Sequence, residues 1–163
     1  MKKALLLEEQ PPQNNDTTHV MFLLKEIELD EQNTLKDMQT AVKGLIELTP
    51  FNNTLINSGI DIYCNEEGKI LNMTPSIRVK TRNKTIDIIH GNVLFAGVDK
   101  NGNTVSLTDT QIDLIKKELT PIRIFTYDKK IINGYSLEHN QKTKKHPNRY
   151  DKHNLYKTVQ NTT

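Results

Sequence analysis

Short apolar runs separated by turn-forming residues constrain the fold of this chain more than any other feature. Residues 4–7, 20–24 and 60–64 are such runs, and Gly, Pro, Asn or Asp residues lie between them. Runs of this length suit β-strands, whereas a helix that spans a bilayer needs about 20 apolar residues. We expect the run at 20–24 to be buried on both faces of a sheet and its continuation to 29 on one face. Further strands are expected at 45–48, 69–71, 86–89, 93–98, 104–107 and 122–125, with 131–132 as a continuation of the last.

Two segments have the pattern of amphipathic helices. Leu35, Met38 and Val42 recur at helical spacing and predict a helix over 34–43, with Gly44 as its C-cap. A second helix is predicted over 109–119, because Thr108 and Gln111 form the capping-box pattern before its apolar face. Residues 52–58 are polar, and we expect a loop there.

Two turn signals predict β-hairpins. The glycine that ends 65–68 predicts a hairpin over 60–71. Asn101 and Gly102 form the strongest short-range hairpin signal. Asp99, Asn101 and Asn103 also imitate the first ligands of a calcium loop, but the positions that need Gly and Glu hold threonines, so the hairpin is favoured.

Charge and composition divide the chain into an acidic body and a basic tail. Residues 1–120 hold 13 Lys and Arg against 17 Asp and Glu, whereas residues 121–163 hold 9 against 3. Hydrophobic residues make up 35% of the chain, which is low for a chain that is packed throughout. We therefore predict one α+β domain over 1–132, with a single twisted, mostly antiparallel sheet and two packed helices. A flexible, disordered basic tail is expected over 133–163.

The N-terminus imitates the start of a signal peptide, but its apolar stretch ends at Glu8. A signal peptide needs an apolar stretch of about 7–15 residues. The single cysteine, Cys64, excludes an internal disulfide framework and a cysteine-based zinc cluster. These features favour a cytoplasmic protein with no membrane contact.

Three motifs together resemble a family of small phage- and plasmid-encoded proteins, domain of unknown function family 3846. The motifs lie at 42–47, at 62–71, and at 91–97 followed by 105–109. The resemblance covers about residues 19–119 and implies a compact α+β domain encoded on a mobile element of a bacterium or its phage. It supplies no catalytic residues. The chain departs from the family pattern at Pro75, which stands where a proline pair is usual, and in the basic tail.

No set of side chains predicts a catalytic or metal site. His90 could act as a general base, but no acid is marked as its partner, and a structural histidine is favoured. Cys64 lacks a nearby cation or helix N-terminus that would lower the pKa of its thiol. Glu66 and Glu67 share a turn, where their side chains diverge. His139, His146 and His153 repeat at a spacing too wide for one metal ion on a helix. We expect no enzyme activity and no cofactor.

Two basic stretches predict contact with nucleic acid as an alternative function. Cations bind phosphate groups, and aromatic rings stack on unpaired bases. The first stretch has its basic side chains at every second position, on one face if the segment is a single strand. Lysines on an edge strand also prevent aggregation, which is sufficient reason for that stretch. The first stretch comprises Arg78, Lys80, Arg82 and Lys84; the second comprises Lys142, Lys144, Lys145, Arg149, Lys152 and Lys157, with Tyr150 and Tyr156.

The function that these observations favour is non-catalytic binding of a protein partner. The acidic body and the lack of a predicted catalytic site support this hypothesis. On this hypothesis the partner is a bacterial or mobile-element protein, and the role is regulatory or anti-defence. Nucleic-acid binding through the two basic stretches, and an enzyme centred on His90, remain as alternatives.

Overall fold

A computed structural model describes residues 1–140 of the chain. Three helices and ten strands form within these residues, so the α+β class is confirmed, but there is one helix more than predicted. Within the described part of the chain, no helix is long and apolar enough to cross a membrane. The elements are β1 (Lys2–Glu9), β2 (His19–Leu29), α1 (Thr34–Val42), β3 (Ile46–Leu48), α2 (Asn53–Asn57), β4 (Ile60–Asn65), β5 (Pro75–Thr81), β6 (Lys84–His90), β7 (Val93–Val98), β8 (Thr104–Val105), α3 (Asp109–Glu118), β9 (Thr120–Phe125) and β10 (Ile131–Glu138).

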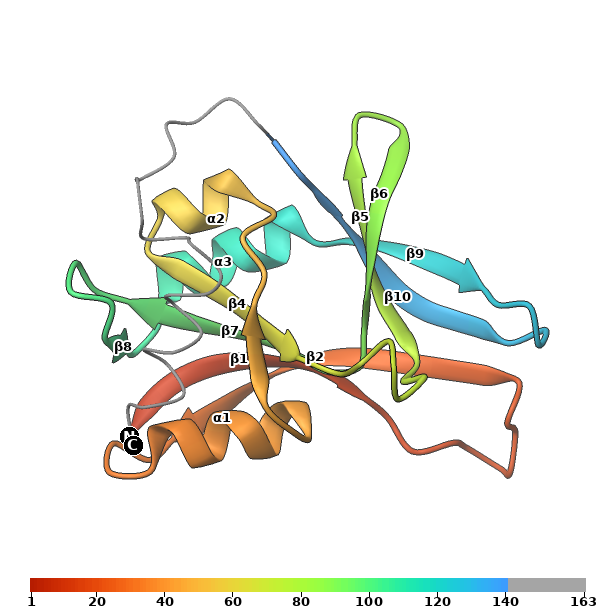
Figure 1. The fold of residues 1–163 in the computed structure, drawn as a ribbon, viewed down its shortest axis with the longest axis horizontal. Helices are drawn as coiled ribbons and strands as arrows, with labels where there is room; N and C mark the ends of the chain where they lie inside the picture. The colour runs from red at the N-terminus through yellow and green to blue at the C-terminus, as the bar shows by residue number, and fades with distance from the viewer. Residues whose placement is uncertain (141–163) are drawn as a thin grey trace.

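The strands form one open, curled sheet (Figure 1). Their order is β3-β4-β7-β1-β2-β10-β5-β6, with β8 on β7 and β9 on β10. Every pair is antiparallel except β10 with β2 and β10 with β5, which are parallel. The prediction of a mostly antiparallel sheet is therefore confirmed.

Strand β1 is buried on both faces because helices cover both faces of this part of the sheet. Leu5 and Leu7 belong to the hydrophobic core that contains residues of α2 and α3. Ala4 and Leu6 belong to a second core that contains residues of α1. The short apolar run at the N-terminus is therefore a central strand.

The two predicted helices form with the predicted buried faces. Leu35, Met38 and Val42 of α1 are buried. The capping box of α3 is present, since Gln111 N–H donates to Thr108 Oγ1 at 3.1 Å and Thr108 N–H donates to Gln111 Oε1 at 2.9 Å. The predicted C-cap of α1 is wrong by one residue, because Lys43 and not Gly44 has the left-handed conformation, with φ 64°.

The predicted hairpin over 60–71 is wrong. β4 pairs with β3 and β7, and residues 66–72 form consecutive turns. Asn65 Oδ1 accepts from Glu67 N–H at 2.7 Å and Met73 N–H donates to Gly68 O at 2.9 Å, so local bonds hold these turns. Ile70 and Leu71 are exposed as a result and form no strand.

The predicted loop at 52–58 contains the short helix α2. Asn52 Oδ1 accepts from Leu55 N–H at 2.9 Å and caps the helix. Asn52 Nδ2 donates to Glu118 Oε1 at 3.1 Å and to Glu138 O at 3.0 Å. This side chain therefore ties α2 to the end of α3 and to β10, which are distant in the sequence.

The sheet extends past the domain boundary predicted at residue 132. β10 continues to Glu138, Leu137 is buried, and His139 N–H donates to Lys80 O at 2.6 Å. The prediction of a flexible, disordered tail that starts at 133 is wrong for residues 133–140, because β10 has strands on both of its edges. The rest of the predicted tail, 141–163, lies outside the described residues.

Gly134 marks the point where one edge of β10 changes neighbours. Residues Ile131 to Asn133 pair with β2, and Tyr135 to Glu138 pair with β5. A Cβ at Gly134 would lie 2.5 Å from Ser76 O, so the backbones approach too closely there for any side chain.

Candidate protein-binding surface

The first half of β2, together with β9 and the first half of β10, forms an arm that extends away from the three helices (Figure 1). The register sets Val20, Ile132 and Ile124 side by side on one face. Ile124 and Ile132 are buried in the core and Val20 packs against it, so this is the inner face of the arm. Because side chains alternate along a strand, the residues between them form an outer face.

The outer face exposes apolar side chains. Met21 is 43% exposed, Leu23 46% and Phe125 69%. This corrects the prediction that 20–24 is buried on both faces: only Phe22 of that run is fully buried, because none of the three helices in residues 1–140 covers the outer face of the arm. Monomeric proteins rarely leave contiguous apolar surface open without a use for it.

A groove of about 430 Å³ runs across the outer face. Met21 and Leu23 line it from β2, and Pro121 and Arg123 line it from β9. Tyr135 lines it from β10. Among the described residues, no carboxylate lies within ion-pair distance of Arg123. The groove is therefore lined mainly by apolar side chains, and at its wall is Arg123, which has no ion-pair partner within residues 1–140.

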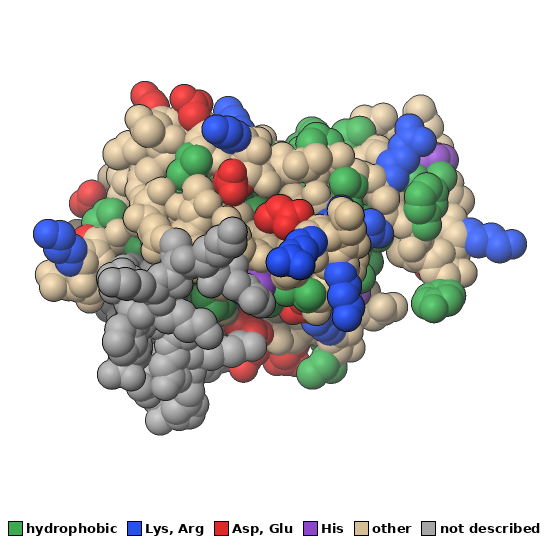
Figure 2. Space-filling model, turned by 90° about the horizontal axis from the view of Figure 1, so that it is seen from above, with side chains coloured by type: hydrophobic (Ala, Val, Ile, Leu, Met, Phe, Trp, Pro, Cys, Tyr) green, Lys and Arg blue, Asp and Glu red, His purple; other side chains and the backbone are tan. Residues whose placement is uncertain are grey.

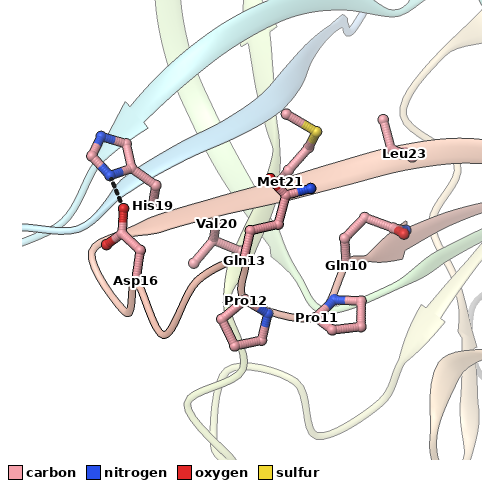
Figure 3. A pocket seen from close by; sticks show the side chains of 9 residues that line it. All are labelled: Gln10, Pro11, Pro12, Gln13, Asp16, His19, Val20, Met21 and Leu23. Carbon is pink, nitrogen blue, oxygen red and sulfur yellow. Dashed lines mark hydrogen bonds and ion pairs between the residues drawn. The ribbon is translucent and has the colours of Figure 1, made fainter.

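A second hollow, of about 390 Å³, lies between β2 and the loop that precedes it (Figure 3). Pro11 and Pro12 line it from the loop, and it shares Met21 and Leu23 with the groove. Figure 3 shows Met21 and Leu23 on one side of β2 and Val20 on the other. Met21 and Leu23 therefore lie between the groove and this hollow. We call the groove, the hollow and these two side chains the arm surface, and Met21 and Leu23 are its centre.

A hydrogen-bonded carboxylate holds the loop at the start of β2. Asp16 Oδ1 accepts from Thr18 Oγ1 at 2.6 Å and from Thr18 N–H at 2.9 Å. Figure 3 shows the third bond, in which Asp16 Oδ2 accepts from His19 Nδ1 at 2.8 Å. These bonds, the Thr18 hydroxyl first, lower the pKa of Asp16 from 3.8 to about 2. Asp16 is therefore ionised near neutral pH, where it fixes the loop and cannot act as a general acid.

The first basic stretch does not form a single face. The chain reverses at 82–83 between β5 and β6, because Arg82 takes a left-handed conformation with φ 58°. Arg78 and Lys80 share the face of β5 opposite to the buried Ile77 and Val79, whereas Lys84 pairs with Thr81 on the returning strand. Arg82 and Lys84 lie exposed at this hairpin. The residues of the second stretch, from Lys142 to Lys157, are outside the described part of the chain.

His90 and Cys64 line the same hollow of about 330 Å³, together with Glu66 and Asp87. The sequence had given no reason to place His90 and Cys64 together. His90 Nδ1 donates to Met73 O at 2.8 Å, which ties the end of β6 to the turns after β4. Cys64 is 8% exposed. Within residues 1–140 no three His, Cys, Asp or Glu side chains are placed to hold a metal ion.

His139 is part of the fold and not an incidental tail residue. Its Nδ1 donates to Phe51 O at 2.6 Å, and its ring meets that of Phe51 edge-on at 5.9 Å. His146 and His153 lie outside the described residues. At the other turn signal, Asp99 Oδ1 accepts from the N–H groups of Asn101 and Asn103, both at 2.9 Å, and β7 pairs with β8. The hairpin prediction is confirmed there.

The three sequence motifs at 42–47, 62–71 and 91–97 meet at the C-terminus of α1. Asn65 Nδ2 donates to Val42 O and Lys43 O, both at 3.1 Å. Asn92 Nδ2 donates to Ala41 O at 3.1 Å. The last carbonyls of a helix have no partner within the helix, and here two asparagines supply partners. The motifs therefore mark a structural junction. The elements that form this junction are different from those that form the arm surface.

Comparison with known proteins identifies the family of the chain. The model of a family described as "Domain of unknown function (DUF3846)" matches residues 19–120. No curated protein and no solved structure matches the chain.

Proposed function

Because the chain belongs to the DUF3846 family, whose description names no activity, we propose its function from its surface: it binds a protein partner, without catalysis, on the outer face of the arm. The observation that carries this proposal is the exposure of Met21 and Leu23 between two concave regions. Open, shallow grooves with apolar centres and polar rims suit a protein surface. On this proposal the partner belongs to a bacterium or a mobile element, in a regulatory or anti-defence setting.

The surroundings of these residues define the chemistry of the partner. Figure 2 shows hydrophobic and basic side chains side by side at the end of the molecule that carries the arm. The groove holds Arg123 without a carboxylate partner in the described part of the chain. We expect the partner to present apolar side chains to Met21 and Leu23 and a carboxylate to Arg123, since buried cations need a compensating charge.

The test compares acidic substitutions on and off the arm. Met21→Asp with Leu23→Asp places charge at the centre of the surface, and both side chains are exposed, so the fold should survive. Ile70→Asp is the matched control, because Ile70 is 83% exposed on a turn outside both arm grooves. A partner captured from bacterial lysate should be lost with the arm variant and kept with the control. Equal capture by both variants, or no captured protein, would contradict the proposal.

Nucleic-acid binding is a second candidate that the β5–β6 hairpin supports. In residues 1–140, Arg78, Lys80, Arg82 and Lys84 have no ion-pair partner, while the nearby Asp87 pairs with Lys69. If these cations bind phosphates, affinity falls steeply with salt, and Arg82→Glu with Lys84→Glu reduces the slope by about one for each phosphate that is no longer neutralised. A truncation that tests the second stretch should start at 141, because β10 continues to Glu138. A nucleic-acid affinity that does not change with salt concentration, or no binding at all, would contradict this candidate function.

A further inference from the structure

Strand β9 has a free edge within the described part of the sheet. It pairs with β10 and with no other strand there. Ile131 N–H donates to Thr18 O at 2.8 Å, so the backbone of Ile131 points toward β2 and away from β9. Ile131 faces Phe125 in the register. In an antiparallel ladder such a pair exchanges no hydrogen bonds, so the N–H and C=O of Phe125 point outward.

The same alternation makes the backbone groups of Arg123 point outward, and Pro121 offers a carbonyl without an N–H. Exposed edges of this kind pair readily with another strand. The side chains beside this edge are unusually open: Phe125 is 69% exposed, and Tyr127 in the following turn is fully exposed. The second half of the β9 edge, around Phe125, therefore has unpaired backbone groups and exposed aromatic rings. It lacks the features that usually prevent an edge strand from pairing with another strand.

We propose that two copies of the chain pair through β9, antiparallel, about a two-fold axis beside Ile124. This register places Arg123 of each copy opposite Phe125 of the other. The outward N–H and C=O groups of both residues are then all used. Each guanidinium lies over the opposite aromatic ring, an arrangement that cation–π attraction favours.

The two registers that are shifted from this one toward Pro121 are worse. An axis at Arg123 sets the two guanidinium groups directly opposite each other, and like charges in that position are destabilising. An axis beside Ile122 sets Pro121 opposite Arg123, and the carbonyl of Arg123 then lacks a donor because proline has no N–H. The register beside Ile124 also sets Pro121 of one copy opposite the turn that carries Tyr127 of the other.

The dimer is expected to form in a concentration-dependent way, since a single strand edge buries a small area. The pairing uses the edge of β9, whereas the protein partner is proposed to contact Met21 and Leu23 on β2; Arg123 lines the groove and also faces Phe125 in the dimer. In the dimer the two arm surfaces belong to one continuous sheet, so a partner with two binding segments would gain affinity by avidity.

Sedimentation equilibrium of the full chain tests the pairing, with circular dichroism to verify folding. Wild type should approach the mass of a dimer as concentration rises. Phe125→Arg places the new arginine of each copy opposite Arg123 of the other copy, so like charges face each other at both symmetric positions. This repulsion should raise the dimer Kd about tenfold or more. Adding Arg123→Glu to Phe125→Arg creates opposite charges in the same register and should restore the dimer.

Backbone pairing is tested at Arg123. Arg123→Pro removes an N–H that points away from β10, so β9 should remain in the sheet. It should weaken the dimer more than Arg123→Ala, which keeps the N–H. A wild-type protein that stays a monomer at every concentration would overturn the proposal. So would a Phe125→Arg variant that dimerises like wild type, or a double variant in which the dimer is not restored. Because Arg123 also lines the groove proposed for the protein partner, capture is compared only between wild type and Phe125→Arg, which leaves Met21, Leu23 and Arg123 intact. Loss of the dimer with unchanged capture, or the reverse, then separates the two proposals.

Discussion

Gly44 lies against the side chain of Asn65, and a Cβ at Gly44 would stand 2.6 Å from Asn65 Nδ2. That nitrogen donates to the last carbonyls of α1, at Val42 and Lys43. Gly44 is therefore required for close approach and not for a left-handed backbone. Two of the motifs that mark the family are joined by this contact.

Asn65→Ala should lower the free energy of unfolding by about 2–3 kcal/mol, because it leaves buried carbonyls of α1 without donors. Gly44→Ala should cost about 1–3 kcal/mol through the steric conflict with Asn65. In the Asn65→Ala background the cost of Gly44→Ala should shrink, since the conflicting atom is gone. Urea denaturation of the four proteins measures this coupling, and simple additivity would contradict the contact.

Gly134→Ala should destabilise the fold strongly, by about 2 kcal/mol or more, since the new Cβ meets the backbone oxygen of Ser76. Asn133→Ala is the matched control on the same strand, and we expect a change within about 0.5 kcal/mol. Thermal unfolding of both variants gives the comparison. Equal stability of the two variants would show that the junction of β10 with β2 and β5 tolerates a side chain.

Asp16 should titrate with a pKa near 2 in the folded protein, below its ordinary value of 3.8. Because the folded pKa is depressed, the stabilising effect of Asp16 is present above pH 3.8 and is lost as the pH falls toward 2. Thr18→Ala removes the largest cause and should raise the pKa toward 3.8, whereas Thr17→Ala should leave it unchanged. NMR titration of the Asp16 carboxyl carbon measures each value, and an unshifted pKa in wild type would refute the hydrogen-bonded loop.

His90→Ala should lower the free energy of unfolding by about 1 kcal/mol, because Met73 O loses a donor. His90→Asn should recover part of this loss, since its side-chain amide can donate from a similar position. Capture of a partner through the arm should be unchanged in both variants. An activity that disappears in both variants while stability stays at the wild-type level would instead support an enzyme centred on His90.

The sequence alone was sufficient for elements whose signals are local. Helix α3 begins with a capping box between Thr108 and Gln111, and the β7–β8 hairpin turns at Asn101 and Gly102. Helix α1 has its apolar side chains at i, i+3 and i+7. In each case the residues that specify the structure lie within a few positions of one another, so spacing and residue type are enough. The acidic body, the lack of a bilayer-length apolar run and the family resemblance also came from the sequence.

The tertiary structure decided which strands are neighbours and which faces are covered. The second half of β10 lies in a segment that the sequence predicts to be a disordered tail, yet the strand lies inside the sheet because β9, β2 and β5 supply its hydrogen bonds. Met21 and Leu23 belong to an apolar run that resembles a buried strand, yet they are exposed because α1, α2 and α3, the helices of the described residues, all lie elsewhere on the sheet. Burial depends on contacts between segments distant in the chain, and the alternation within one strand does not specify them. For that reason the arm surface could be identified only after the strands were assembled.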